Sequence, residues 1–377
     1  MKWGRKMEMR RFICAATRVV IIGVLFAAGG CAVTPQAPVK SIVIPVFPPP
    51  PEPARFFYER SIYSSADVIR DDSKSSFRRL VTGEIRAGEG LSKPYGIAVQ
   101  KGRVYVTDTV KRVVMVFDFP QGVYSEIGTQ AEGAMRLPLG IDVDAGGVVY
   151  VSDGLNRRIS VYAPDGKFLR HLGNPEILQR PAGIAIDAAG SRLYVVDIGG
   201  INSINHGVQV FDAKTGAHLR SIGKRGDGDG EFNLPRDVAL GKDGNLYIVD
   251  GGNFRIQVMR QDGSFVRSFG SIGRQGGQFS RPKEIAIDPA GNVYVIDTAF
   301  GNFQIFTAEG KLLLDVGGRS NTDGPAKYML PSGIAVDEDG RVYVVDQYFR
   351  KVDVYRPASL DPTAGYLGRP SQASGAR

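Results

Sequence analysis

Pro94-Tyr95-Gly96-Ile97-Ala98-Val99 is the stretch of sequence that decides the fold, because it returns five more times. The further copies begin at Pro138, Pro181, Pro235, Pro282 and Pro331, and they read PLGIDV, PAGIAI, PRDVAL, PKEIAI and PSGIAV. Successive copies are about 43 to 54 residues apart, the period of a repeated supersecondary unit. One such unit cannot bury both of its faces, so the six units must pack against one another.

Each unit contains several short strands. A Gly-containing turn leads to an apolar strand that ends in aspartate, and these aspartates are Asp108, Asp153, Asp197, Asp250, Asp297 and Asp346. A third strand of alternating character follows, as at residues 158–162, and residues 168–172 supply a fourth. Asp-Gly turns at Asp165, Asp262 and Asp339 favour antiparallel hairpins. The pattern predicts an all-β fold, a six-bladed β-propeller over residues 94–356, and disfavours the alternative of a parallel solenoid.

The composition agrees with this prediction. The chain has 377 residues, 43% of them hydrophobic, with 48 Gly and 22 Pro, which describes a turn-rich chain with a large core. The formal charge is +8, but the six basic residues and one acidic residue of positions 1–30 account for +5 of it. The remainder is too balanced to favour nucleic acid as a partner.

Three motifs resemble the NHL repeat: Pro-x-Gly-Ile-Ala-Val, Tyr-Val-x-Asp and Asp-x-x-Asn-x-Arg. The last is found at Asp153-Asn156-Arg158 and at Asp250-Asn253-Arg255. The resemblance covers about residues 94–356 and implies a propeller. It implies no single function, because the family includes scaffolds, ligand binders and enzymes.

The last unit stops at its third strand, so the ring needs an outer strand from elsewhere. Residues 76–82 share Phe-x-Arg-x-aliphatic with residues 168–172, and we expect this N-terminal segment to complete the sixth blade. Residues 55–75 are apolar enough to form a further strand on the ring, without an assigned place.

The N-terminal segment predicts export. A basic stretch precedes the apolar run 19–28, which is too short to span a membrane and has the length of a signal-peptide core. Ala28-Gly29-Gly30-Cys31 resembles the lipobox of bacterial lipoproteins, which implies cleavage before Cys31 and a lipid on its thiol. Ala32 after that cysteine is similar to outer-membrane sorting, so we expect a periplasm-facing protein in the cell envelope. An ordinary secretory signal is the alternative.

These observations divide the chain into five parts. They are a signal peptide (1–30), a Pro-rich tether (31–54), a closing strand and lead-in (55–93), the propeller (94–356) and a disordered tail (357–377). A ligand for a polyproline-binding module is the less favoured reading of the tether.

The sequence contains no recognisable catalytic constellation. Related propellers use histidines around zinc or carboxylates around calcium. However, His171 and His218 are expected on outer strands, and only His206 lies in a loop between second and third strands. The repeated strand-end aspartates are expected to cap turns, and Gly226–Gly230 is expected to be a turn rather than a calcium loop. We therefore predict no metal, no cofactor and no catalysis.

Departures from the repeat indicate the candidate binding residues. After the opening proline, four units carry small or apolar residues followed by glycine, but the fourth and fifth carry Arg236-Asp237 and Lys283-Glu284. These positions begin the innermost strands and form the rim of the channel mouth. The candidate rim is Arg236, Asp237, Lys283 and Glu284, with Tyr95, Arg255 and His206 as further contributors. Recognition of a partner and mutual salt bridges between the two blades are both open.

The sequence therefore predicts a lipid-anchored binding or scaffolding propeller in the bacterial envelope, with an unidentified protein or ligand as partner. The alternative is a propeller enzyme of the lyase or lactonase type with a metal site in the channel.

Overall fold

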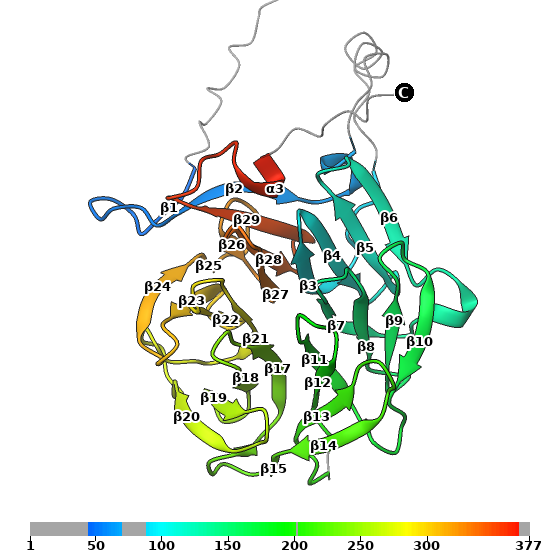
Figure 1. Cartoon of the computed structure of the whole chain (residues 1–377). Helices are drawn as coiled ribbons and strands as arrows, with labels where there is room; N and C mark the ends of the chain where they lie inside the picture. Colours follow the sequence, from blue (N-terminus) through cyan, green and yellow to red (C-terminus); the bar gives the residue numbers. More distant parts are fainter. Residues whose placement is uncertain (1–43, 70–87, 201–202, 369–377) are drawn as a thin grey trace, which may run out of the picture. The chain divides into compact units, whose positions relative to one another are not determined.

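Six antiparallel sheets follow one another along the chain and form the blades of a propeller (Figure 1). The computed structural model describes residues 44–69, 88–200 and 203–368. These residues belong to one unit that begins at Ile44. The signal peptide and Cys31 lie outside the described residues.

Each blade begins at one of the six prolines, as predicted. The first blade comprises β3 (Pro94–Gln100), β4 (Arg103–Asp108), β5 (Val113–Asp118) and β6 (Val123–Ile127). The second comprises β7 (Pro138–Val143), β8 (Val149–Asp153), β9 (Arg158–Tyr162) and β10 (Phe168–Leu172). The third comprises β11 (Pro181–Ile186), β12 (Arg192–Asp197), β13 (Gly207–Asp212) and β14 (His218–Ile222).

The remaining blades repeat this order. The fourth comprises β17 (Pro235–Leu240), β18 (Asn245–Asp250), β19 (Arg255–Arg260) and β20 (Phe265–Phe269). The fifth comprises β21 (Pro282–Ile287), β22 (Val293–Asp297), β23 (Asn302–Phe306) and β24 (Leu312–Val316). The sixth has β27 (Pro331–Val336), β28 (Val342–Asp346) and β29 (Lys351–Pro357).

Short elements connect the blades. Two-stranded ladders pair β15 (Lys224–Arg225) with β16 (Glu231–Phe232), and β25 (Gly318–Arg319) with β26 (Lys327–Tyr328). The 3-10 turns η1 and η2 cover Ser65–Asp67 and Ala131–Gly133.

The core lies between neighbouring blades. Every residue of β8 is buried, because its alternating side chains pack against the blades on both sides, whereas β14 is exposed except for Ile222. One apolar cluster joins Val104 and Phe117 of the first blade to Tyr343 and Val345 of the sixth. Each innermost strand also contacts the innermost strand of the next blade, and β27 contacts β3. The six blades therefore form a closed ring.

Hydroxyl groups donate hydrogen bonds from one blade to the innermost strand of the next. Thr107 Oγ1 donates to the Leu139 carbonyl at 2.8 Å, and Thr298 Oγ1 donates to the Pro331 carbonyl at 2.9 Å. Ser332 Oγ donates to the Tyr95 carbonyl at 2.8 Å, which links the last blade to the first. These bonds satisfy carbonyls that face another blade instead of a paired strand.

The glycine of the repeat has a steric reason. A Cβ atom at Gly96 would lie 2.5 Å from the Leu139 carbonyl oxygen, and one at Gly333 would lie 2.6 Å from the Tyr95 oxygen. The backbones of neighbouring blades thus approach too closely for a side chain that points toward the next blade. Asp237 and Glu284 depart from this rule.

An N-terminal strand closes the ring, as predicted, but it is not the expected segment. β2 (Phe56–Ile62) pairs antiparallel with β29, and β1 (Val46–Phe47) pairs with β2 at the outer edge of the sixth blade. Figure 1 shows these blue strands beside the red strand β29. Residues 76–82 lie outside the described residues, and the position we expected them to take is occupied by β2.

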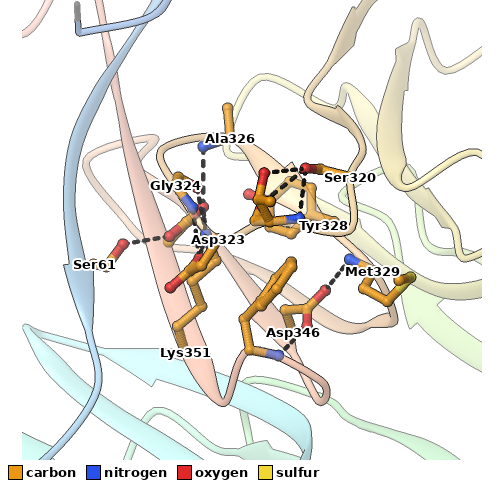
Figure 2. Close-up of polar contacts among 12 residues, drawn as sticks. Ser61, Ser320, Asp323, Gly324, Ala326, Tyr328, Met329, Asp346 and Lys351 are labelled. Carbon is orange, nitrogen blue, oxygen red and sulfur yellow. Dashed lines mark hydrogen bonds and ion pairs between the residues drawn. The ribbon is translucent and has the colours of Figure 1, made fainter. Parts of the chain in front are cut away.

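Lys351 fixes the connection between the fifth and sixth blades to this closure. Its side chain is fully buried, and its Nζ lies 3.0 Å from carboxylate oxygens of Asp323 and Asp353. The same Nζ donates to the Gly324 carbonyl at 2.7 Å, and Ser61 of β2 donates to Asp353 at 2.5 Å. Figure 2 shows Lys351 among Ser61, Asp323 and Gly324. One buried cation therefore holds together β29, the closing strand and the loop around Asp323.

Parts of both terminal segments are ordered, contrary to expectation. Val46 and Phe47 belong to the Pro-rich segment 31–54, expected as a tether, yet they form β1. Within the expected disordered tail, the short helix α3 (Gly365–Gly368) buries Leu367, and the Arg341 guanidinium donates to the Ala364 carbonyl at 2.9 Å. Among the described residues, no helix is long and apolar enough to cross a membrane.

Candidate functional site

The strand-end aspartates cap turns, as expected from their repetition. Asp153 is fully buried and accepts hydrogen bonds from the backbone amides of Arg136, Leu137 and Asn156 and from the Asn156 side chain. Asp346 accepts from two amides before β27 and from two amides after β28. The hydrogen bonds that these carboxylates accept hold the loops in place at this end of the blades.

The four rim residues of the fourth and fifth blades divide into two pairs. Asp237 and Glu284 are each 8% exposed and line the central channel, a cavity of about 190 Å³, whereas Arg236 and Lys283 line a separate pocket at its mouth. Alternation along a strand explains this division, because consecutive side chains point to opposite sides. No ion pair joins any two of the four in the part of the chain that the structure describes, so mutual salt bridging is not what holds them.

Asp237 and Glu284 instead bond to the next blade. Asp237 Oδ2 accepts from the Ile285 amide at 3.0 Å, and Glu284 Oε2 accepts from the Ile334 amide at 3.3 Å. Burial raises the pKa of Asp237 to about 7, and repulsion from the nearby carboxyl of Asp142 adds to this rise. Burial also raises the pKa of Glu284 well above its usual range, and repulsion from Asp237 adds to that rise. Both groups therefore ionise less readily than ordinary carboxyls.

The sequence analysis missed a third channel carboxylate. Asp142 of β7 accepts from the Ile186 amide at 2.9 Å, and burial raises its pKa to about 6. The corresponding position is alanine in each of the other five blades. A comparison of the six repeats at the position two residues after that of Asp237 would therefore have identified Asp142.

Lys283 and Tyr95 meet across the mouth of the channel. Lys283 Nζ lies 4.1 Å from the centre of the Tyr95 ring, although the sixth blade separates their two blades around the ring. This distance is typical of a cation–π contact. Burial lowers the pKa of Lys283 to about 8, opposed by Glu284 and reinforced by repulsion from Arg236 and Arg281. The mouth therefore holds Arg236, Arg281 and Lys283 near one another.

These cations surround a small pocket. It has a volume of about 210 Å³ and is lined by Arg236, Arg281, Pro282, Lys283, Thr298 and Leu330. The side chains of Arg236, Arg281 and Lys283 form no ion pair with any described carboxylate. Such a pocket can accept an anionic group.

Arg255 and His206 are held in structural contacts on neighbouring blades. Arg255 Nε lies 2.9 Å from Asp250, and its guanidinium also donates to the carbonyls of Gly228 and Glu231. His206 is 2% exposed, and its Nδ1 accepts from the Leu234 amide at 3.2 Å. Burial lowers the pKa of His206, with the charge of Arg225 as a second cause.

The residues of the channel do not fit a metal site. Each of its three carboxylates accepts a backbone hydrogen bond, and the described residues contain no group of three His, Cys, Asp or Glu side chains that could hold a metal ion. His171 and His218 lie on the outer strands β10 and β14, as expected. Gly226–Gly230 connects β15 to β16 as a turn, in which Glu231 accepts from the Gly228 amide.

Comparisons with known proteins identify the repeat. Residues 232–259 match the NHL repeat. A probable peptidyl-alpha-hydroxyglycine alpha-amidating lyase of Caenorhabditis elegans is 30% identical over 99 residues, which are 26% of each chain. NHL repeat-containing protein 3 of Mus musculus is 36% identical over 90 residues, which are 24% of each chain. The chain thus spans about a quarter of the length of these curated relatives.

The fold has solved counterparts. A gluconolactonase of Xanthomonas campestris aligns with a TM-score of 0.54 and 17% identity, over 71% of this chain and 86% of that one. At this identity the likeness concerns the fold alone.

Proposed function

Starting from an NHL-repeat six-bladed β-propeller, we propose that the protein is a lipid-anchored binding platform of the bacterial cell envelope. The lipid is carried by Cys31, and the propeller faces the periplasm from the outer membrane. The channel mouth holds a partner in the envelope, and no reaction takes place in the channel.

The observation that carries this proposal is the cluster of cations at the mouth. Arg236 and Lys283 depart from the repeat on two consecutive blades, and neither forms an ion pair with a carboxylate among the described residues. The blade fold does not require charged residues at these positions, because the other four blades have none there. The innermost strands hold both side chains on a rigid ring, which favours recognition by a preformed surface.

An enzyme of the lyase or lactonase type is the second candidate. Its support is the partial similarity to a probable amidating lyase and the fold shared with a gluconolactonase. Measuring the metal content of the purified protein tests it, together with assays for lactone hydrolysis and for lyase activity. Stoichiometric metal with either activity would favour this candidate over the binding platform.

Crosslinking in the native envelope tests the binding platform. We expect the full-length protein to capture a partner that the variant Arg236→Ala/Lys283→Ala no longer captures. The matched control is Lys214→Ala/Lys311→Ala, which removes two exposed lysines at the opposite end of the blades. Equal capture by all three proteins would contradict a role for the mouth, provided that their melting temperatures agree.

A further inference from the structure

The two ends of the propeller carry different balances of charged residues. In every blade, the start of the first strand and the loop between the second and third strands lie at the same end. We call this end the mouth face. It comprises the residues on either side of each opening proline, the connections between successive blades, and the described residues of the loops 109–112, 154–157, 198–200, 203–206, 251–254, 298–301 and 347–350.

The mouth face is basic. Its six loops contain no Asp or Glu in the sequence. The cations of these loops and of the positions beside the prolines are Lys93, Lys111, Arg112, Arg157, Arg180, Arg236, Arg281, Lys283 and Arg350. The connections between blades add Arg136, Lys224, Arg225, Arg274, Arg319 and Lys327, against Asp67, Glu89, Glu132, Glu176, Asp227, Asp229, Glu231 and Asp323. Lys111 is paired with Glu89 at 2.8 Å, and Lys224 with Glu231 at 3.2 Å. The strand-end aspartates at this end are buried beneath the loops, where backbone amides surround them.

The opposite end is less basic. Its loops between first and second strands contain the exposed or half-buried Asp187, Asp243, Glu338 and Asp339 and the buried Asp144, Asp288 and Asp337, against Lys101, Lys242 and Arg341. A charge distribution of this kind selects and orients a charged partner before contact. The charge balance of the mouth face therefore favours an anionic partner.

Exposed apolar side chains accompany the cations. Val110, Leu155 and Tyr348 occupy the second position of the corresponding loops in three blades and are 62%, 54% and 59% exposed. Ile204, in the third blade's loop, is 75% exposed. These side chains stand on separate loops, so each offers a single apolar contact to a ligand that lies across the mouth face.

We propose that the mouth face binds an acidic protein segment in which apolar side chains alternate with carboxylates. This inference rests on the proposed function and specifies the chemistry of its partner. One partner carboxylate enters the pocket between Arg236, Arg281 and Lys283, and the apolar side chains of the partner contact Leu155 and Tyr348 on the surrounding loops.

Two other anions fit the observations less well. Single-stranded nucleic acid binds to aromatic stacking platforms, whereas three of the four projecting side chains are aliphatic. A flat anionic bilayer contacts projecting groups, whereas Arg236 and Lys283 are partly buried at the centre of the mouth. A projecting acidic side chain can reach both of them.

Binding of labelled probes to the full-length protein tests this proposal. The probes are a peptide that alternates Glu with Leu, the same peptide with Ser in place of Leu, an oligothymidylate of equal charge, and phosphatidylglycerol vesicles. Fluorescence anisotropy measures the oligomers, and flotation measures the vesicles. We expect the Glu-Leu peptide to bind about tenfold more tightly than the Glu-Ser peptide and the oligothymidylate.

Two variants locate the contacts. Arg236→Ala/Arg281→Ala/Lys283→Ala should weaken binding of both peptides by about tenfold or more, and Leu155→Ser/Tyr348→Ser should remove only the advantage of the Glu-Leu peptide. The Lys214→Ala/Lys311→Ala control should bind like the unmodified protein. Melting temperatures show whether each variant is folded.

Tighter binding of the oligothymidylate or the vesicles than of the Glu-Leu peptide, lost in the same triple variant, would overturn the proposal in favour of that ligand. Peptide binding unchanged in both mouth variants would also overturn it. Either result leaves the proposed function standing if Arg236→Ala/Lys283→Ala still abolishes capture in the envelope, because the partner would then have a different chemistry.

Discussion

A single aspartate joins two loops in each blade, and Asp153 shows what this requires. Its buried carboxylate accepts hydrogen bonds from both the connection that precedes β7 and the loop that follows β8. We expect Asp153→Ala to lower the free energy of unfolding by about 3 kcal/mol, because several buried donors lose a charged acceptor. Denaturant titration measures the change. Asp165→Ala, in an exposed hairpin turn, should change it by less than about 0.5 kcal/mol, and equal losses would contradict the capping role.

The channel carboxylates should make stability depend on pH. Burial raises the folded-state pKa of Asp237 to about 7, above its value in the unfolded chain of about 4. The folded protein therefore binds more protons between these values, and stability falls as the pH rises from about 4 to about 7. Asp237→Asn should flatten this part of the profile of melting temperature against pH. Asp229→Asn, in an exposed loop, is the control and should leave the profile unchanged.

The sequence shows where a position differs from its own repeat, but it does not show which groups only the closed ring brings together. The departures at Arg236 and Lys283 were visible in the sequence. The separation of Asp237 and Glu284 from them depends on strand alternation at the channel, and the contact of Lys283 with Tyr95 joins non-adjacent blades. No spacing along the chain encodes that contact.

At the scale of elements, the pairing of β2 with β29 is the step that closes the ring. Removing residues 31–43 should leave the melting temperature unchanged, because the described propeller begins at Ile44. Extending the deletion through Ile62 should lower it sharply or cause aggregation, because β29 would then present an unpaired edge. Thermal unfolding and light scattering measure both effects. Equal stability of the two shortened proteins would contradict closure by β2.

The inner three strands of each blade could be predicted from the sequence, whereas the segment that forms the outer strand of the sixth blade was predicted wrongly. Inner strands are buried on both faces, so their sequences are constrained to apolar runs such as Val104-Tyr105-Val106. β2 has the sequence Phe-Phe-Tyr-Glu-Arg-Ser-Ile and buries only Phe56 and Ile62, because its outer position leaves much of it in contact with solvent. Similarity to residues 168–172 therefore favoured the wrong N-terminal segment for this position.

At the scale of the whole molecule, the proposed anchor gives a test that does not depend on the propeller. Cys31→Ser should leave the precursor uncleaved or release the protein in soluble form, because the acylated thiol would be missing. Intact mass and detergent partitioning of cell fractions measure this outcome. Partitioning into detergent with an unchanged mass would show that Cys31 carries no lipid. Cys14→Ser is the matched control and should have no effect.

Closure by an N-terminal strand also has a mechanical consequence for a tethered protein. If the chain is held at Cys31 and a partner is held at the mouth face, tension enters the propeller through β1 and β2 before it reaches any other strand. A pull along β2 loads its hydrogen bonds to β29 together, in shear, whereas a pull across the strand breaks them one after another. Rupture of this pair would open the ring at the sixth blade, so the direction of force on the tether decides how long the propeller stays closed.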